Sequence, residues 1–336
     1  MTENPDLYCG NIIKSRIRLA RNINGLPFFI KDVKVANQVT HEVATALFKE
    51  ERFNVYKMSE LSLLKKESLK ERHLISDALI KNSVTGACLI NDSLTVSVML
   101  HEEDVIREQC ILSGLRLFEA YKKLNHIDDE ISKRLDVAYD EKLGYLTACP
   151  TNVGTGMRAS VMMFLPALSE SGKIKHLMAK VIDLGFTVRG IYGEGSFSEG
   201  GIYQISNEMT IGLSEYEILE SVSDTVLEIC REERKLEEEL YIKNEIKTTD
   251  KARKSFGVLT NALTLTYEEL LFHLQNVKLG AMLGLINIDK IEELDELLLS
   301  CRKSVILDDF GKNLTETELE IKRAEITRNK LLKIKE

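Results

Sequence analysis

The sequence has few cysteines for its length, and no two of them form a C-x-x-C pair. The six are spread over the whole chain, at Cys9, Cys88, Cys110, Cys149, Cys230 and Cys301. Disulfide frameworks and zinc sites need denser, regularly spaced cysteines. This spacing argues against both and predicts no metal ligands, and it favours reduced thiols in the cytoplasm.

The sequence also lacks long apolar runs, an N-terminal signal core and a basic excess. Lysine and arginine number 45 against 53 acidic residues, giving a net charge of −8. No run reaches the ~18 apolar residues of a membrane span. A general nucleic-acid binder would carry a basic face. We therefore expect a soluble protein with no membrane and no nucleic-acid partner.

Proline is absent after Pro166, and glycine becomes rare after Gly212. The first two-thirds of the 336 residues has the pattern of an α+β fold, and the last ninety residues look helical. We predict strands at residues 93–100, 144–148 and 186–192, a hairpin pair at 202–207 and 209–213, and helices at 105–134 and 157–168.

A capping box predicts the start of a long helix at Ser214, where Glu217 can bond back to the cap. The mixed-charge stretch 231–247 fits a solvated helix or connector. The boundary between two domains is expected near residues 225–245. The stretch 278–284 interrupts the apolar pattern and is a candidate functional turn.

Two of the arginines in KSRIRLARNINGLPF (residues 14–28), Arg16 and Arg18, stand two positions apart. If SRIRL is a strand, Arg16 and Arg18 point to the same face. Two cations side by side repel each other unless an anion lies between them. The alternative is a pair of solvated surface arginines.

Three carboxylates, Glu102, Glu103 and Asp104, come together in HEEDVIREQ (residues 101–109). Their position after a predicted strand is one where enzymes often place catalytic groups. At the start of a helix they would also complement the helix dipole. Glu103 and Arg107, four residues apart, could form a simple ion pair on that helix.

The stretch CPTNVGTGMRAS (residues 149–160) is typical of a phosphate-binding turn without the usual lysine. Gly154 and Gly156 leave the backbone free to turn its N–H groups toward an anion at a helix N-terminus. A cation at that end is disfavoured by the dipole. Arg158 is therefore easier to explain if an anion binds there.

A glycine-rich stretch, RGIYGEGSFSEGG (residues 189–201), begins with Arg189 at a predicted strand end and carries Glu194 and Glu199. It suits a loop that closes over a ligand, or a mobile surface loop. Several arginines converging on one cleft would match a triphosphate, because each offers a planar fork of donors and keeps its charge.

These motifs together resemble the phosphagen (guanidino) kinases, and among them most closely the bacterial protein-arginine kinases. The resemblance rests on SRIRLARN-x-x-G-x-P, EED-x-x-R, CPTNVGTGMRAS and RG-x-x-GE, and spans residues 15 to about 213. It implies a catalytic domain with an antiparallel sheet flanked by helices, residues 1–230, followed by a small all-α domain, residues 231–336. Small-metabolite members carry a helical domain before the first motif, which here begins at Ser15. A chain without this helical domain would suit a site that must admit an arginine on a protein surface.

The resemblance also implies a role for each matching position. Glu103 is expected as the catalytic glutamate, and Glu194 as a second carboxylate that holds the guanidinium. Cys149 is expected beside the substrate guanidinium. The alternative for Cys149 is a buried apolar residue. ATP with Mg²⁺ is the expected cofactor. Its binding residues are Ser15, Arg16, Arg18, Arg107, Arg158 and Arg189.

Some positions depart from the family pattern, and one histidine stands apart from its motifs. His101 and Val105 replace asparagine and histidine around the Glu-Glu-Asp triplet. The stretch 319–324 lacks the first arginine of a motif associated with phosphoarginine binding, so feedback there is not expected. His73 falls where the family often has histidine, and a packed structural role is favoured.

The expected function is phosphorylation of arginine residues in proteins, which marks them for a stress response or Clp-protease degradation. The alternatives are a kinase of small guanidines and a catalytically weak adaptor that binds nucleotide or phosphoarginine. The family resemblance implies a zinc-binding activator, a Clp-type unfoldase, a stress repressor and a homodimer.

Overall fold

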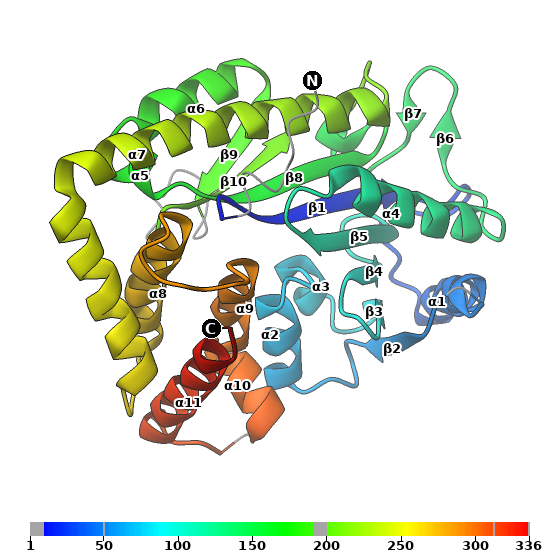
Figure 1. The fold of residues 1–336 in the computed structure, drawn as a ribbon. Helices are drawn as coiled ribbons and strands as arrows, with labels where there is room; N and C mark the ends of the chain where they lie inside the picture. The colour runs from blue at the N-terminus through cyan, green and yellow to red at the C-terminus, as the bar shows by residue number, and fades with distance from the viewer. Residues whose placement is uncertain (1–9, 50, 191–199, 312, 335–336) are drawn as a thin grey trace.

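The computed structural model describes residues 10–49, 51–190, 200–311 and 313–334. Its centre is an eight-stranded sheet in which each neighbouring pair is antiparallel, in the order β2-β3-β4-β5-β1-β8-β10-β9 (Figure 1). This confirms the α+β prediction. The strands are β1 (Ile12–Arg21), β2 (Phe53–Lys57), β3 (Ala87–Asn91), β4 (Val96–Leu100), β5 (Ile106–Ser113), β8 (Met157–Phe164), β9 (Phe186–Gly190) and β10 (Ile202–Asn207), and a separate hairpin is formed by β6 (Tyr139–Asp140) and β7 (Gly144–Tyr145).

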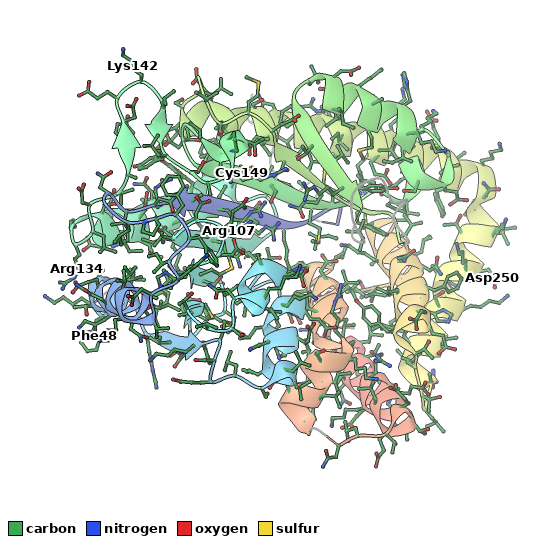
Figure 2. All side chains as sticks on the ribbon, turned by 180° about the vertical axis from the view of Figure 1, so that it is seen from behind. Phe48, Arg107, Arg134, Lys142, Cys149 and Asp250 are labelled. Carbon is green, nitrogen blue, oxygen red and sulfur yellow. The ribbon has the colours of Figure 1, made fainter. Side chains whose placement is uncertain are left out.

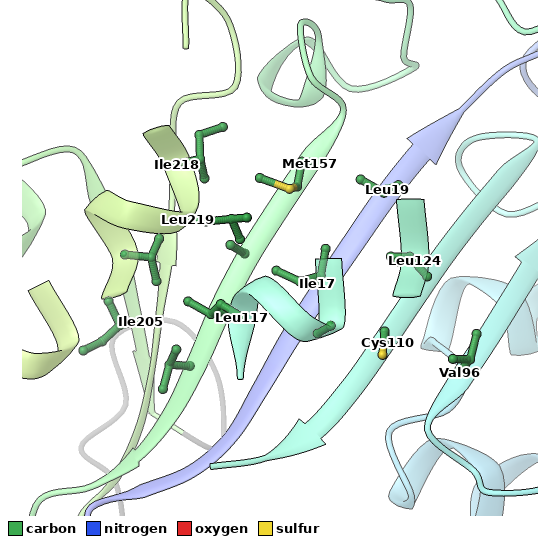
Figure 3. Close-up of a cluster of buried hydrophobic side chains, with 14 of the residues drawn as sticks. Ile17, Leu19, Val96, Cys110, Leu117, Leu124, Met157, Ile205, Ile218 and Leu219 are labelled. Atoms are coloured by element: carbon green, nitrogen blue, oxygen red, sulfur yellow. The ribbon is translucent and has the colours of Figure 1, made fainter. Parts of the chain in front are cut away.

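One face of the sheet is apolar and is covered by helices. These are α1 (Val33–Leu47), α4 (Leu117–Ser132), α6 (Ile174–Asp183) and the first part of α7 (Glu215–Asn261). Figure 3 shows Leu124 of α4 near Cys110, and Leu219 of α7 near Ile205. Burying each such side chain contributes roughly 1.5–3 kcal/mol, so this layer holds the sheet in place.

On the opposite face of the sheet, the described residues form an apolar cover at each of the two ends. Helices α2 (Leu63–Glu71) and α3 (Asp77–Lys81) pack on β3 and β4 around Met58, Leu79 and Met99. At the other end, Phe164 packs with Met282 and Leu298. The strand positions between these two apolar clusters are polar and carry the arginines described below.

The C-terminal helices have their own core, which includes Leu259, Leu270 and Leu294. Helix α7 starts at the predicted capping box and kinks at Asn244 (φ −133°, ψ 33°); in Figure 1 it crosses the sheet and then turns toward the other C-terminal helices. The remaining helices are α5 (Pro166–Glu170), α8 (Tyr267–Met282), α9 (Glu292–Ser300), α10 (Lys303–Phe310) and α11 (Glu316–Ile334).

Helix α10 packs on α2 through charged groups. Lys65 Nζ lies 2.8 Å from a carboxylate oxygen of Asp308, and Arg72 Nη2 lies 2.7 Å from one of Asp309. The C-terminal helices are therefore joined to the sheet both through α7 and through α2. Among the described residues, no helix is both long and apolar enough to cross a membrane.

Three predicted elements were wrong. Residues 105–134 form strand β5 and then α4, residues 157–168 form strand β8 and then α5, and residues 209–213 form no strand. The candidate turn at 278–284 lies largely inside α8. The two helix errors have one cause: in a largely buried central strand, apolar residues also fall four apart and imitate a helix.

Candidate active site

The predicted arginines gather on the polar face of the sheet. In the pairing of β1 with β8, Arg18 stands directly opposite Arg158, and in the pairing of β1 with β5, Ala20 stands opposite Arg107. Side chains directly opposite each other on adjacent strands have Cβ atoms ~5 Å apart. Arg16 lies two positions before Arg18 on the same face. The strand prediction for SRIRL and its shared face are confirmed.

The electrostatics of this face show an excess of positive charge. Burial and the charges of Arg107, Arg158 and Arg189 lower the pKa of Arg16 to about 10. Burial and neighbouring arginines also lower the pKa of Arg18 well below its usual value. Arg18 Nε is buried and has no hydrogen-bond partner among the described residues. Like charges at this spacing destabilise a sheet, and a polyanion such as a triphosphate would relieve the repulsion.

Neutral and acidic neighbours hold two of these guanidiniums in place. Arg158 donates from Nε to Ser206 Oγ (3.2 Å) and from Nη2 to Thr187 Oγ1 (2.6 Å). Arg107 pairs with Glu102, which also accepts from Ser76. The hydroxyls fix the direction of Arg158 without cancelling its charge, so the donors remain suited to an anion.

The three carboxylates lie in the tight turn between β4 and β5, and their predicted place at a helix start was wrong. His101 N donates to Val105 O (2.8 Å), and His101 has a positive φ of 62°. Glu102, rather than Glu103, pairs with Arg107. Glu103 is exposed at this turn. In the view of Figure 2, the labelled Arg107 and Cys149 lie close to each other.

His101, one of the departures from the family pattern, fixes this turn to α1. It is fully buried, and its Nε2 lies 3.2 Å from Thr40 Oγ1 and 3.1 Å from Ala36 O. Burial lowers its pKa to about 4, so it is neutral near pH 7. His101 therefore anchors the turn to α1 through these two contacts.

Asp104 links the carboxylate turn to the loop that carries Cys149. Its Oδ1 accepts from Ala148 N (2.7 Å) and from Asn22 Nδ2 (2.7 Å). Asn22 Oδ1 in turn accepts a hydrogen bond from Val105 N (2.9 Å). Glu103 and Cys149 therefore belong to segments whose backbones are held by one hydrogen-bonded network. The sequence showed Asp104 as an acid, but nothing in it indicated this role.

The loop of Cys149 does not open a helix, so the prediction of a phosphate-binding helix N-terminus was wrong. It runs through a short 3₁₀ helix (Pro150–Asn152) into strand β8. Cys149 is partly exposed, which excludes the buried apolar alternative, and its Sγ lies 3.0 Å from Thr151 Oγ1.

The two glycines of this loop are explained by close packing. A Cβ at Gly154 (φ 115°) would overlap the carbonyl of Thr210, and one at Gly156 (φ 64°) would overlap Arg21 and the carbonyl of Ala20. A positive φ combined with a backbone neighbour at that position admits only glycine.

Arg21 supports the loop from the helical face of the sheet. It is buried, pairs with both carboxylate oxygens of Asp128 and lies 3.5 Å above the ring of Tyr145. Its Nη1 donates to Thr155 O (3.0 Å). The loop is thus held on one side by Arg21 and on the other by Asp104.

The prediction for Ser15 is corrected by the geometry of its side chain. Ser15 is fully buried on the face of β1 opposite Arg16, where its Oγ donates to Gly114 O (2.7 Å) and accepts from Arg116 N (2.9 Å). Strand alternation puts Lys14 on the arginine face instead. Burial lowers the pKa of Lys14. Sequence alternation alone could have identified Lys14.

Two further predictions concern His73 and Glu194. Burial and the charges of Arg16, Lys14 and Arg302 lower the pKa of His73 to about 3. His73 therefore lies beside the arginine face as a neutral group. Glu194 lies outside the described residues, so its predicted role has no structural counterpart here.

Comparisons with known proteins identify the family of this chain and its fold. A model of the ATP:guanido phosphotransferase C-terminal catalytic domain matches residues 34–236, and a model of the protein-arginine kinase McsB C-terminal domain matches residues 245–336. The chain belongs to the ATP:guanido phosphotransferase family.

Curated relatives are similar over nearly the whole chain. A protein-arginine kinase of Caldanaerobacter subterraneus subsp. tengcongensis is 42% identical, with 96% of this chain and 97% of that protein covered. One from Halothermothrix orenii is 41% identical, with 95% and 93% covered.

Solved structures of two other kinases share the fold over about two thirds of this chain. The duplicated taurocyamine kinase from Schistosoma mansoni, with transition-state-analogue components bound, has a TM-score of 0.60 at 27% identity; the match covers 69% of this chain and 34% of that chain. Lombricine kinase has a TM-score of 0.59 at 27% identity, with 68% and 67% covered.

Proposed function

We propose that this chain is a protein-arginine kinase, which transfers the γ-phosphoryl group of ATP to the guanidinium of arginine residues in proteins. The observation that carries the proposal is the gathering of Arg16, Arg18, Arg107 and Arg158 on one sheet face, beside the linked segments of Glu103 and Cys149. The similarity to protein-arginine kinases over almost the full chain supports a protein acceptor.

The arginines supply the phosphate-binding part of the reaction. Arg16, Arg18, Arg107, Arg158 and Arg189 would bind the phosphates of ATP and stabilise the charge on the group in transfer. Their mutual repulsion is already present in the folded protein. Binding energy from the nucleotide therefore offsets a strain that the sheet holds in advance.

The carboxylates supply the acceptor part. A guanidinium is a poor nucleophile while it keeps its proton, because its pKa lies above ~12. Glu103, exposed at the turn, would orient the guanidinium and take this proton. A nitrogen–phosphorus bond then forms as the bond from the γ-phosphorus to the bridging oxygen breaks, giving ADP and phosphoarginine. Cys149 and Glu194 would complete the guanidinium site.

Mg²⁺ would neutralise phosphate charge when bound with ATP. The described residues contain no group of three or more potential metal-ligating His, Cys, Asp or Glu side chains. This fits an ion that is held largely by phosphate oxygens and water, as Mg²⁺ often is at nucleotide sites.

The wider cellular role follows from the family resemblance. We propose a cytoplasmic homodimer that works with a zinc-binding activator, a Clp-type unfoldase and a stress repressor. The change of core along α7 supports a domain boundary near residues 225–245, because Leu236 packs with the sheet and Leu259 packs with the C-terminal helices.

The test is phosphosite mass spectrometry under non-acidic conditions after incubation with ATP, Mg²⁺ and a mixed protein substrate. Phosphoarginine on proteins is expected, and Glu103→Gln should abolish it while ATP still binds. Full activity of the Glu103→Gln variant would contradict the site. Turnover of free arginine without protein labelling would favour a small-guanidine kinase, and ATP binding without any transfer would favour the adaptor.

A further inference from the structure

A groove lies between the β6–β7 hairpin and residues 209–215, next to the loop of Cys149. Its volume is about 710 Å³. Four large apolar side chains that line it are exposed, namely Tyr139 (58%), Leu143 (48%), Ile211 (48%) and Leu213 (39%). Contiguous exposed apolar surface on a soluble protein commonly marks an interaction site.

The groove also has a negative character. Glu141 and Glu215 line it. Its floor includes Tyr145, whose pKa is raised by burial and by the negative charges of Asp128, Glu215 and Asp129, against the opposing charge of Arg21. Lys142 also borders the groove, and in Figure 2 it points away from the body of the protein at the hairpin tip. A cationic segment with apolar residues would complement this surface.

The groove shares residues with the loop that carries Cys149. Gly154 and Thr155 line it, and Tyr145 N donates to Gly154 O (2.8 Å). Thr210 Oγ1 donates to Thr151 O (2.8 Å) and Val153 O (2.7 Å). Cys149 precedes Gly154 by five residues, so the two are at most about 18 Å apart. An extended polypeptide of five to six residues covers that distance.

We propose that this groove binds the part of a protein substrate that flanks the target arginine, as a cationic and apolar segment about five to six residues away from it. The inference rests on the proposed function. A free small guanidine bound near Cys149 has no chain to reach the groove. The groove would therefore separate protein acceptors from small ones.

The test compares a long and a short acceptor. The long one is a peptide of thirteen residues with one central arginine and with lysine and leucine five and six residues from it, on either side in two versions. The short one is acetyl-Ala-Arg-Ala-amide. The variants are Tyr139→Ala with Leu143→Ala, and Glu141→Lys, with Leu184→Ala on the exposed end of α6 as the control.

We expect the groove variants to raise the KM for the long peptide about ten-fold, a change of ~1.4 kcal/mol. The kcat for that peptide, the Kd for ATP and the kinetics of the short acceptor should match those of the control. An unchanged KM for the long peptide would overturn the proposal, and so would equal losses for both acceptors, since these indicate a displaced loop.

Failure of the proposed function has a different signature, because the unmodified protein would then phosphorylate neither acceptor. Fluorescence anisotropy with the long peptide tests the groove in that case, and equal binding to all variants would overturn it. Light scattering tests whether a second copy of the chain occupies the groove instead. A change in particle mass in the groove variants, without a change in peptide binding, would also overturn the proposal.

Discussion

Replacing Asp104 with alanine tests whether one carboxylate holds the two halves of the acceptor site together. Asp104 is buried, and one of its oxygens accepts from both Ala148 N and Asn22 Nδ2. Each donor left without an acceptor costs about 1–3 kcal/mol. Asn22 keeps a second bond to Leu146 O, which reduces its share. We expect the free energy of unfolding to fall by about 2–4 kcal/mol.

The effect on activity should be larger than the effect on nucleotide binding. Loss of the Ala148 bond frees the backbone next to Cys149, and a displacement of about 1 Å can reduce the rate ~100-fold. The arginines of β1, β5 and β8 are held by the pairing of these strands, in which Asp104 takes no part. Urea denaturation, isothermal titration with ATP and steady-state kinetics on a protein acceptor would measure the three quantities, and only the Kd for ATP should stay constant.

The matched control is Asp104→Asn. Asparagine keeps a carbonyl oxygen that can accept both bonds, so most of the stability and activity should return. If Asp104→Asn were as inactive as Asp104→Ala, the charge of Asp104 rather than its hydrogen bonds would matter. Full activity of Asp104→Ala would refute the role of the network altogether.

Three other predictions follow from buried charges. Arg18→Met should raise the melting temperature of the ligand-free protein, because it relieves like-charge repulsion. It should also remove the stabilisation by ATP, which for the unmodified protein is ~2.7 kcal/mol at an ATP concentration of 100 times Kd. A lower melting temperature of the variant without ATP would contradict this prediction. Burial raises the pKa of Glu233 to about 8 and also that of its neighbour Glu237, so the folded protein keeps a proton that the unfolded chain releases near pH 4.5. This contribution to stability is complete below pH 4.5 and is lost as the pH rises through 8. In urea denaturation, Glu237→Gln should flatten the decline of the free energy of unfolding between pH 6 and 9. Parallel pH profiles for the variant and the unmodified protein would show that the Glu233–Glu237 pair is not responsible. Arg323→Ala should lower the free energy of unfolding by ~2–4 kcal/mol, because the buried guanidinium donates to Cys301 O and Leu265 O. Calorimetry should show unchanged ATP binding. A higher Kd for ATP would contradict this and indicate that α11 acts on the sheet.

Much of the candidate site could be predicted from the sequence, because its residues stand in short local motifs. Strand alternation alone puts Arg16 and Arg18 on one face. The repulsion between them already indicated an anion. Arg107 and Arg158 followed from their motifs, and the structure places both on the same face.

Other features could not be predicted because they depend on pairing across the chain. The choice between helix and strand for residues 106–113 and 157–164 is made by the antiparallel partners on both sides, which periodicity cannot show. The same pairing brings Arg158 directly opposite Arg18, across a separation in the sequence that no local pattern reveals.

The sequence by itself determined the residue types of the proposed phosphate and guanidinium sites, since the charge of arginine and the alternation of a strand are local properties. The tertiary structure decided how these residues are held. Asp104 joins Ala148 to Asn22 across more than a hundred residues, and Arg21 reaches Thr155 beneath the same loop. Such contacts form only when distant segments fold together, because a hydrogen bond depends on distance and direction in space and not on separation along the chain.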